Sequence, residues 1–358
     1  MSTMLKKLSV CLLAAVLIAS GCASRQSGGG KGESASSDLL KPLDPPAKVR
    51  VGMKGVPSDA GVIIGLYKGY FKELGLDVEV FSFNSGQEMI NPLAGGHLDV
   101  GMAVTDAAMF NAFLRQIPVK IVADKGYNIP GRAYYQLVIR KDLENQIKDY
   151  KDLKGRTLAV VATASLDEIC LDRALKAGGF STISPEVKIT VIKSFPDMLA
   201  ALANKSIDGA MLIEPWIAQG EKMGVLKRFR DPSEFDRDAQ IAIVIYGDGI
   251  LKRPEVAKRF MVGYLKALRD YNDAFVKNKG TEQVIDILAS KSLTKDKEMY
   301  RLMNPAGLNP NGYVNVKGLE ADVKWYEERG LLKGDLKVEE VVDNQFVDSA
   351  IQAIGKYQ

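Results

Sequence analysis

The sequence predicts an α/β protein with two lobes, each built on a mostly parallel β-sheet that is flanked by helices. Short valine-rich segments alternate with helical segments along the body of the chain, and this alternation is typical of parallel sheets. The series then starts again, and two loop-like segments lead from the first series to the second and back. The length of 358 residues also favours two domains.

The first series begins at Lys48 and the second near Thr157. Each segment is assigned from its hydrophobic periodicity and from the turn residues that bound it. The first series is expected to contain strand Val49–Met53, helix Ala60–Leu74, strand Asp77–Phe83, helix Gln87–Ala94, strand Asp99–Val104, helix Ala107–Arg115 and strand Val119–Asp124. The second is expected to contain strand Thr157–Val161, helix Leu166–Ala177, strand Lys188–Lys193, helix Pro196–Ala203 and strand Asp208–Ile213.

From Val78 to Val104 the first series aligns with the second without a gap. A shift of 109 positions places Val78 on Val187 and Asp99 on Asp208. Any two strand–helix–strand units share a hydrophobic pattern, but matching aspartates ahead of a strand are harder to explain in this way. We therefore interpret the series as two similar lobes and both aspartates as turn residues.

Two crossings connect the lobes. Gly126–Ala133 and Asp231–Asp238 are each followed by an apolar strand, Tyr135–Arg140 and Ile241–Tyr246. The expected first lobe therefore consists of residues 48–133 and 239–358, and the second of residues 134–238. Helices are expected at Val256–Lys277, Thr281–Ser290, Lys295–Leu302, Gly318–Arg329 and Asn344–Ile354.

The first 47 residues predict export and a membrane tether. Residues 1–21 have the pattern of a secretory signal peptide, because the apolar run Leu8–Ala19 is too short to span a bilayer. Ile18–Cys22 resembles the bacterial lipobox, which makes Cys22 the expected lipidation site; an ordinary signal peptide with a chance cysteine is the alternative. Residues 22–47 are rich in Gly, Ser and Pro and predict a flexible tether. The expected location is the outer face of the cytoplasmic membrane or the periplasm.

The composition excludes several classes of function. The net charge of +4 falls to +2 without Lys6 and Lys7 of the leader, which is too small for a nucleic-acid partner. One histidine and three cysteines leave little material for a metal site or a catalytic triad. Cys170 occupies an apolar position of a helix and is interpreted as a core residue. We expect no catalytic residue, no metal and no cofactor.

The loops that follow the strands are the expected binding site. Ligands of parallel sheets bind beyond the carboxyl ends of the strands, where helix N-termini favour anions. Two lobes joined by two crossings would direct both sets of loops into one cleft that closes on a small solute. The candidate ligand-binding residues are Pro57, Ser58, Asp59, Ser85, Thr105, Asp106, Tyr127, Thr163, Ser165, Glu214, Trp216 and Tyr246.

Some of these candidates also have a purely structural interpretation. Asp59 and Asp106 precede helices and are suited to cap them, and Ser165 has capping-box spacing with Glu168. A carboxylate that faced the ligand would instead imply an amino, hydroxyl or heterocyclic N–H group on it. Trp216 is the aromatic candidate for stacking on a planar ligand.

Several motifs resemble a known family. They are Gly65–Phe71 with the sequence GLYKGYF, Gly75–Glu79 with GLDVE, Leu93–Gly101 with LAGGHLDVG, Asp152–Thr157 with DLKGRT, Ile207–Ala210 with IDGA, and Glu214-Pro215. They resemble the periplasmic and lipoprotein solute-binding proteins for nitrate, sulfonates, taurine and thiamine precursors. The resemblance covers roughly Val49–Gly263. It implies a two-lobed fold of the periplasmic-binding-protein type II kind and an ATP-binding-cassette permease as partner.

The leading hypothesis is therefore a monomeric lipoprotein that delivers a small organic solute, such as a sulfonate, carboxylate or N-heterocycle, to an importer. One alternative is a solute-sensing module for a separate receptor. Another is an enzyme on the same fold, similar to a relative that makes the thiamine pyrimidine. That relative has a cysteine-rich active site, and this chain has no such cluster.

Overall fold

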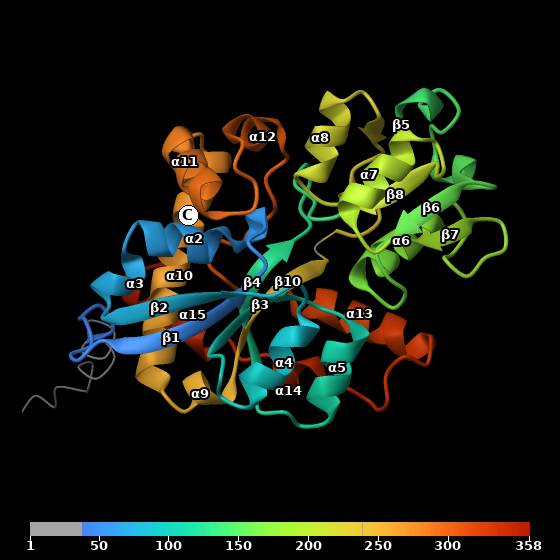
Figure 1. Ribbon diagram of the computed structural model, residues 1–358. Coiled ribbons are helices and arrows are strands. Elements are labelled where there is room, and N and C mark those ends of the chain that lie inside the picture. Colours follow the sequence, from blue (N-terminus) through green and yellow to red (C-terminus); the bar gives the residue numbers. More distant parts are fainter. Residues whose placement is uncertain (1–37, 238) are drawn as a thin grey trace, which may run out of the picture.

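The computed structural model describes residues 38–237 and 239–358 (Figure 1). The expected signal peptide, Cys22 and most of the expected tether lie outside the described residues. Two five-stranded sheets lie side by side, with strand orders β2-β1-β3-β10-β4 and β7-β6-β8-β5-β9. In each sheet one strand, β10 or β5, runs antiparallel to its neighbours, and the others are parallel to one another. The predicted fold class is confirmed.

The elements follow the predicted alternation closely. The strands are β1 (Ala47–Met53), β2 (Leu76–Ser82), β3 (Val100–Val104), β4 (Lys120–Tyr127), β5 (Gln136–Arg140), β6 (Thr157–Val160), β7 (Lys188–Val191), β8 (Gly209–Leu212), β9 (Leu226–Arg228) and β10 (Gln240–Tyr246). The helices are α2 (Ala60–Tyr67), α3 (Tyr70–Glu73), α4 (Gln87–Ala94), α5 (Ala107–Leu114), α6 (Leu166–Ala177), α7 (Phe195–Ala203), α8 (Trp216–Lys222), α9 (Asp248–Leu251), α10 (Pro254–Phe275), α11 (Thr281–Lys291), α12 (Lys297–Leu302), α13 (Val316–Glu328), α14 (Val338–Val341) and α15 (Gln345–Ile354).

The first expected helix is interrupted. The sequence predicts one helix over Ala60–Leu74, but the structure has α2 and α3 separated at Gly69, whose φ is +77°. Only glycine adopts this left-handed conformation without steric cost, so the helix stops where the glycine stands. Strand β9 and helices α8, α9 and α14 are short and are not among the expected elements.

The two sheets repeat each other in detail. Their strand orders correspond strand for strand, as the alignment of the two series predicts. In the first sheet Asp99 Oδ2 accepts the backbone N–H of Arg50 at 2.8 Å, and in the second Asp208 Oδ2 accepts that of Thr157 at 2.9 Å. Both aspartates lie in the bend directly before a strand, as expected, but their role goes beyond the turn. Each carboxylate joins the start of one strand to its neighbour, and buried Asp99 also pairs with Arg253.

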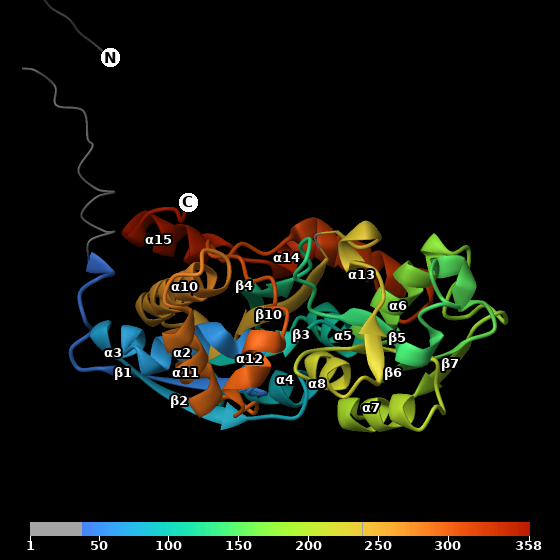
Figure 2. The ribbon, with the colours of Figure 1, turned by 90° about the horizontal axis from the view of Figure 1, so that it is seen from above.

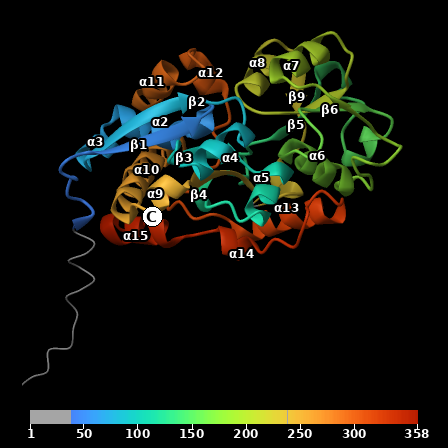
Figure 3. The same ribbon diagram turned by 60° about the horizontal axis from the view of Figure 1, so that its bottom comes forward.

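The alternating side chains of the sheets build the core on both faces. In β10, Val244 and Tyr246 face the cluster formed with α2 and α10, while Ile243 and Ile245 face the cluster formed with α4, α5 and α13. In the second sheet α7 and α8 cover one face and α6 the other. Helix α13 lies next to both α5 and α6 (Figure 3). The C-terminal helices therefore bridge the two sheets.

The last part of the expected tether packs onto the first sheet. Leu39 is buried, Leu43 donates its N–H to the carbonyl of Leu74, and Arg259 donates to the carbonyl of Asp38. Gly75, with φ +70°, lies so close to Leu43 that a Cβ would sit 2.2 Å from the Leu43 nitrogen. Residues 38–47 are thus part of the folded body. Within the described chain, no helix is long and apolar enough to cross a membrane.

Candidate functional site

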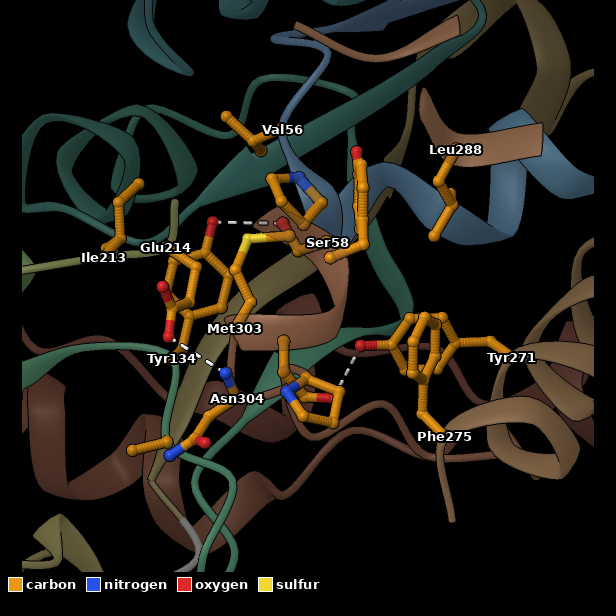
Figure 4. A pocket seen from close by; sticks show the side chains of 15 residues that line it. Val56, Ser58, Tyr134, Ile213, Glu214, Tyr271, Phe275, Leu288, Met303 and Asn304 are labelled. Atoms are coloured by element: carbon orange, nitrogen blue, oxygen red, sulfur yellow. Dashed lines mark hydrogen bonds between the residues drawn. The ribbon is translucent and has the colours of Figure 1, made fainter. Parts of the chain in front are cut away.

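A cavity lies where the loops of both sheets meet the C-terminal helices (Figure 4). It contains about 490 Å³ of empty space, part of it continuous with solvent. Its walls come from the β1–α2 loop, the first crossing, the β8–α8 loop, and α10, α11 and the segment around α12. The lining residues are Val56, Pro57, Ser58, Ala133, Tyr134, Ile213, Glu214, Tyr271, Phe275, Leu288, Tyr300, Met303, Asn304, Pro305 and Ala306. Seen from above, α12 and α8 stand next to each other across the junction (Figure 2).

A buried ion pair supports one wall of the cavity. Lys125 Nζ lies 3.0 Å from Asp59 Oδ1, and both side chains are almost completely buried. Asp59 Oδ2 accepts the N–H groups of Gly55 and Val56, which closes the β1–α2 loop. Burial is the largest influence on Lys125 and lowers its pKa, but the attraction and hydrogen bond of Asp59, together with Tyr134 and Asp124, raise the pKa above its ordinary value. Lys125 is therefore an ammonium ion held behind the loop.

The ammonium is connected to the cavity through two hydroxyl groups. Lys125 Nζ donates to Ser58 Oγ at 2.8 Å, and Ser58 Oγ is 3.1 Å from Tyr134 Oη. Both hydroxyl-bearing residues line the cavity. The charge of Lys125 thus acts on the cavity through a short chain of hydrogen bonds.

Glu214 joins the second sheet to the C-terminal segment. Its Oε1 accepts from Arg228 Nη2 at 2.8 Å and from the N–H of Asn304 at 3.0 Å, while Oε2 accepts the N–H of Ala218 at 3.1 Å. Burial raises the pKa of Glu214 above its ordinary value, against the opposing effect of Arg228. Both carboxylate oxygens are engaged, so Glu214 connects the β8–α8 loop to Asn304 of the C-terminal segment.

Three of the predicted site residues line this cavity, namely Pro57, Ser58 and Glu214. Asp59 lies directly behind it in the ion pair with Lys125 rather than capping α2 with its side chain. Thr105 and Asp106 do not line it. Asp106 Oδ1 accepts the N–H of Met109 at 2.7 Å, which is the capping role weighed for it, and burial raises its pKa.

The remaining polar candidates are distributed along other loop ends. Ser85 Oγ accepts the N–H of Glu88 at 3.4 Å, and its counterpart Ser194 does the same for Asp197. Ser165 donates to the carbonyl of Ala162 and to Asp167, so it does not cap α6 with its side chain. Thr163 is exposed. Among the aromatic candidates, Trp216 and Tyr127 are partly buried outside the cavity lining.

The structure places Tyr246 away from the cleft, contrary to expectation. The sequence suggests that it follows a strand at the cleft edge, but β10 runs antiparallel, and Tyr246 pairs with Val100 and Lys120 at the starts of their strands. Its hydroxyl donates to the carbonyl of Ala257 in the core. The other end of β10 faces the crossings, where buried Gln240 donates to Asp124.

Several residues of the site were not among the predictions. Lys125 follows a predicted strand directly, and a lysine ending an apolar run was the available signal. Tyr134 lies at the end of the first crossing. Tyr271, Phe275 and the segment after α12 contribute from C-terminal helices, whose apolar positions look like ordinary core positions in the sequence.

A second polar cluster connects α6, the second crossing and α13. Arg173 Nη1 lies 2.9 and 3.0 Å from the two oxygens of Asp236, and Nη2 lies 2.8 Å from Asp322 Oδ1. Asp322 Oδ2 and the hydroxyl of Thr105 are buried without a hydrogen-bond partner in the described part of the chain. Burial raises the pKa of Asp322 to about 7, despite the opposing effect of Arg173.

We expect Asp322→Asn to flatten part of the pH dependence of stability. Because the folded pKa lies above the unfolded value, the folded state keeps a proton that the unfolded state has lost, and stability falls as the pH rises toward 7. The asparagine abolishes this titration and keeps an amide oxygen that can accept from Arg173. Between pH 5 and 7 the free energy of unfolding of the variant, relative to that of the wild type, should therefore rise by roughly 1 kcal/mol per pH unit. Urea unfolding at several pH values measures this, and parallel curves for the two proteins would contradict it.

Comparison with known proteins identifies relatives of this chain. Residues 43–269 match the family model described as the NMT1-like family. The taurine-binding periplasmic protein of Escherichia coli (strain K12) is 28% identical over 206 residues, which is 56% of this chain and 60% of that relative. The aligned part therefore spans less than two thirds of the relative's length.

Solved structures show the same fold. The periplasmic nitrate-binding protein of Synechocystis PCC 6803 superposes with a TM-score of 0.68 at 16% identity, covering 87% of this chain and 89% of the other. The periplasmic aliphatic sulphonate binding protein of Escherichia coli gives 0.67 at 16% identity, covering 84% and 92%. A desulfurization enzyme also shares the fold, with a TM-score of 0.59 at 14% identity over 85% of this chain and 99% of the other.

Proposed function

Because this chain belongs to the NMT1-like family, we propose that it is an exported solute-binding protein that delivers a small organic solute to an ATP-binding-cassette importer. The cavity between the loops of the two sheets carries this proposal, since residues of both lobes line it and Glu214 accepts the N–H of Asn304 across it. Opening and closing at the two crossings would admit and enclose a solute. The taurine-binding relative supports the same role.

The residues around the cavity favour binding over catalysis. Its lining contains neither Cys nor His. Cys170 is buried, and burial raises its thiol pKa well above the ordinary value, which disfavours the reactive thiolate. His97, the only histidine, is exposed on the surface after α4.

A ligand screen tests the proposed function. Thermal-shift measurements on the purified protein against sulfonates, carboxylates, amino-pyrimidines and flavins should identify a class that binds saturably in the range of about 1 μM. Mass spectrometry should recover the bound solute unchanged. Ser58→Ala should weaken the binding of that solute about tenfold, because it breaks the hydrogen-bonded chain from Lys125 to Tyr134 at the cavity. Ser206→Ala, at an exposed serine before β8, should leave binding unchanged. Conversion of the solute, or no binding by any class, would contradict the proposal.

We further propose that the mature chain begins at a lipid-modified Cys22 and is held at a membrane by the segment up to Ser37. The small and polar composition of that segment supports a spacer role. Mass spectrometry of the N-terminal peptide should show a diacylglyceryl modification. Cys22→Ser should release the protein from the membrane fraction, and membrane retention of this variant would rule the anchor out.

A further inference from the structure

The cavity has two chemically different walls (Figure 4). One wall presents the hydroxyl groups of Ser58 and Tyr134, with Lys125 behind them. The facing wall is formed by rings and aliphatic side chains from α10, α11 and the end of α12, namely Tyr271, Phe275, Leu288, Tyr300 and Met303. Tyr271 already donates its hydroxyl proton to the carbonyl of Ala306, so this wall offers mainly apolar surface.

The hydroxyl chain has a preferred direction. Lys125 can only donate, so Ser58 Oγ accepts from it and keeps its own proton for Tyr134 Oη. The positive charge of Lys125 also favours hydrogens that point away from it, and each bond in such a chain polarises the next. In this arrangement the phenolic proton of Tyr134 is left to donate into the cavity.

The carboxylate of the cavity has no capacity for a cationic ligand. Glu214 is neutralised by Arg228 and accepts two backbone N–H groups. An ammonium group on a solute would find no free counterion here and would lose its hydration, which is costly. A free acidic residue would imply an amino group on the solute, but both oxygens of Glu214 are already engaged.

We propose that the cavity takes an organic acid whose oxygen accepts from Tyr134, with an apolar body of at least ring size against Phe275, Leu288 and Met303, and with no ammonium group. This inference rests on the proposed function and names the solute class for the same site. It separates the chain from binders of very small or zwitterionic anions. Nitrate has no apolar body that could contact the apolar wall. Taurine carries an ammonium group, which would lose its hydration in the cavity without gaining a counterion.

Isothermal titration calorimetry with a matched series of probes tests the proposal. Benzenesulfonate and hexane-1-sulfonate should bind, methanesulfonate should bind at least tenfold more weakly, and taurine and nitrate should give no heat. Tyr134→Phe should weaken benzenesulfonate binding about tenfold, the usual effect of a lost charge-assisted hydrogen bond. Tyr67→Phe, at an exposed tyrosine of α2, is the matched control and should change nothing.

Phe275→Ala separates the two walls. It should weaken the binding of hexane-1-sulfonate and benzenesulfonate while leaving methanesulfonate at its low affinity. Taurine or nitrate binding as tightly as benzenesulfonate would overturn the inference and leave the proposed function intact. Failure of this series together with the wider ligand panel would contradict both.

Discussion

Replacing Lys125 with Met should lower the free energy of unfolding by about 3–5 kcal/mol, because it leaves the Asp59 carboxylate buried without its cation. Asp59 keeps the N–H groups of Gly55 and Val56, so the loss comes from the missing charge and not from an open loop. Ser58 also loses its donor. Urea unfolding followed by circular dichroism measures the change.

The double variant Asp59→Asn/Lys125→Met should recover most of this loss, since the amide oxygen can still accept the two loop N–H groups and no charge remains. Lys266→Met is the matched control. It breaks a 2.9 Å pair with Glu73 whose side chains are far more exposed, and such pairs contribute about 1 kcal/mol or less. Equal losses for Lys125→Met and Lys266→Met would show that the buried pair is not important for stability.

The fold could be predicted from the sequence because its signals are local. The alternation of strands and helices can be recognised from neighbouring residues. The repeat and the two matching aspartates can be recognised from a constant shift of 109 positions. The repeat predicts two similar lobes, and in the structure the strand orders of the two sheets correspond. Strand direction was the missing information. Tyr246 was assigned to the cleft because β10 was treated like a parallel strand, whereas its pairing with β3 is antiparallel.

The site was predicted only in part, for a related reason. Pro57, Ser58 and Glu214 lie on loops that follow parallel strands, and the rule for such loops identifies them. Tyr271 and Phe275 lie on a helix more than a hundred residues after the first crossing, at positions whose spacing only indicates burial. Which buried rings face a cavity depends on how α10, α11 and α12 pack against the β8–α8 loop, and periodicity carries no such information.

The contacts between the two sheets are polar as well as apolar, which bears on how tightly the lobes are held together. Arg173 on α6 reaches Asp322 on α13 and Asp236 in the second crossing, and Glu214 reaches Asn304. One hydrophobic cluster also continues from the first sheet to the second. Both kinds of contact therefore connect the second sheet and its helices to the C-terminal part of the chain.

Arg173→Met should be the other strongly destabilising change, with a cost of about 3–5 kcal/mol near pH 8. It leaves two buried carboxylates, Asp236 and Asp322, without their common cation. Burial raises the pKa of both already, and Arg173 is the largest opposing influence in each case. Without it both pKa values should rise further above the unfolded values.

The loss should therefore depend on pH with a defined sign. Below the raised pKa values the two carboxyl groups bind protons in the folded state, so the cost of Arg173→Met should shrink toward pH 5 and grow toward pH 8. Arg173→Met/Asp322→Asn should recover part of the loss at pH 8, because one buried charge is then absent. Arg301→Met, which removes an exposed pair with Glu282, should cost about 1 kcal/mol or less at both pH values. A loss that is the same at pH 5 and pH 8 would mean that packing around Arg173, and not its charge, holds α6 to α13.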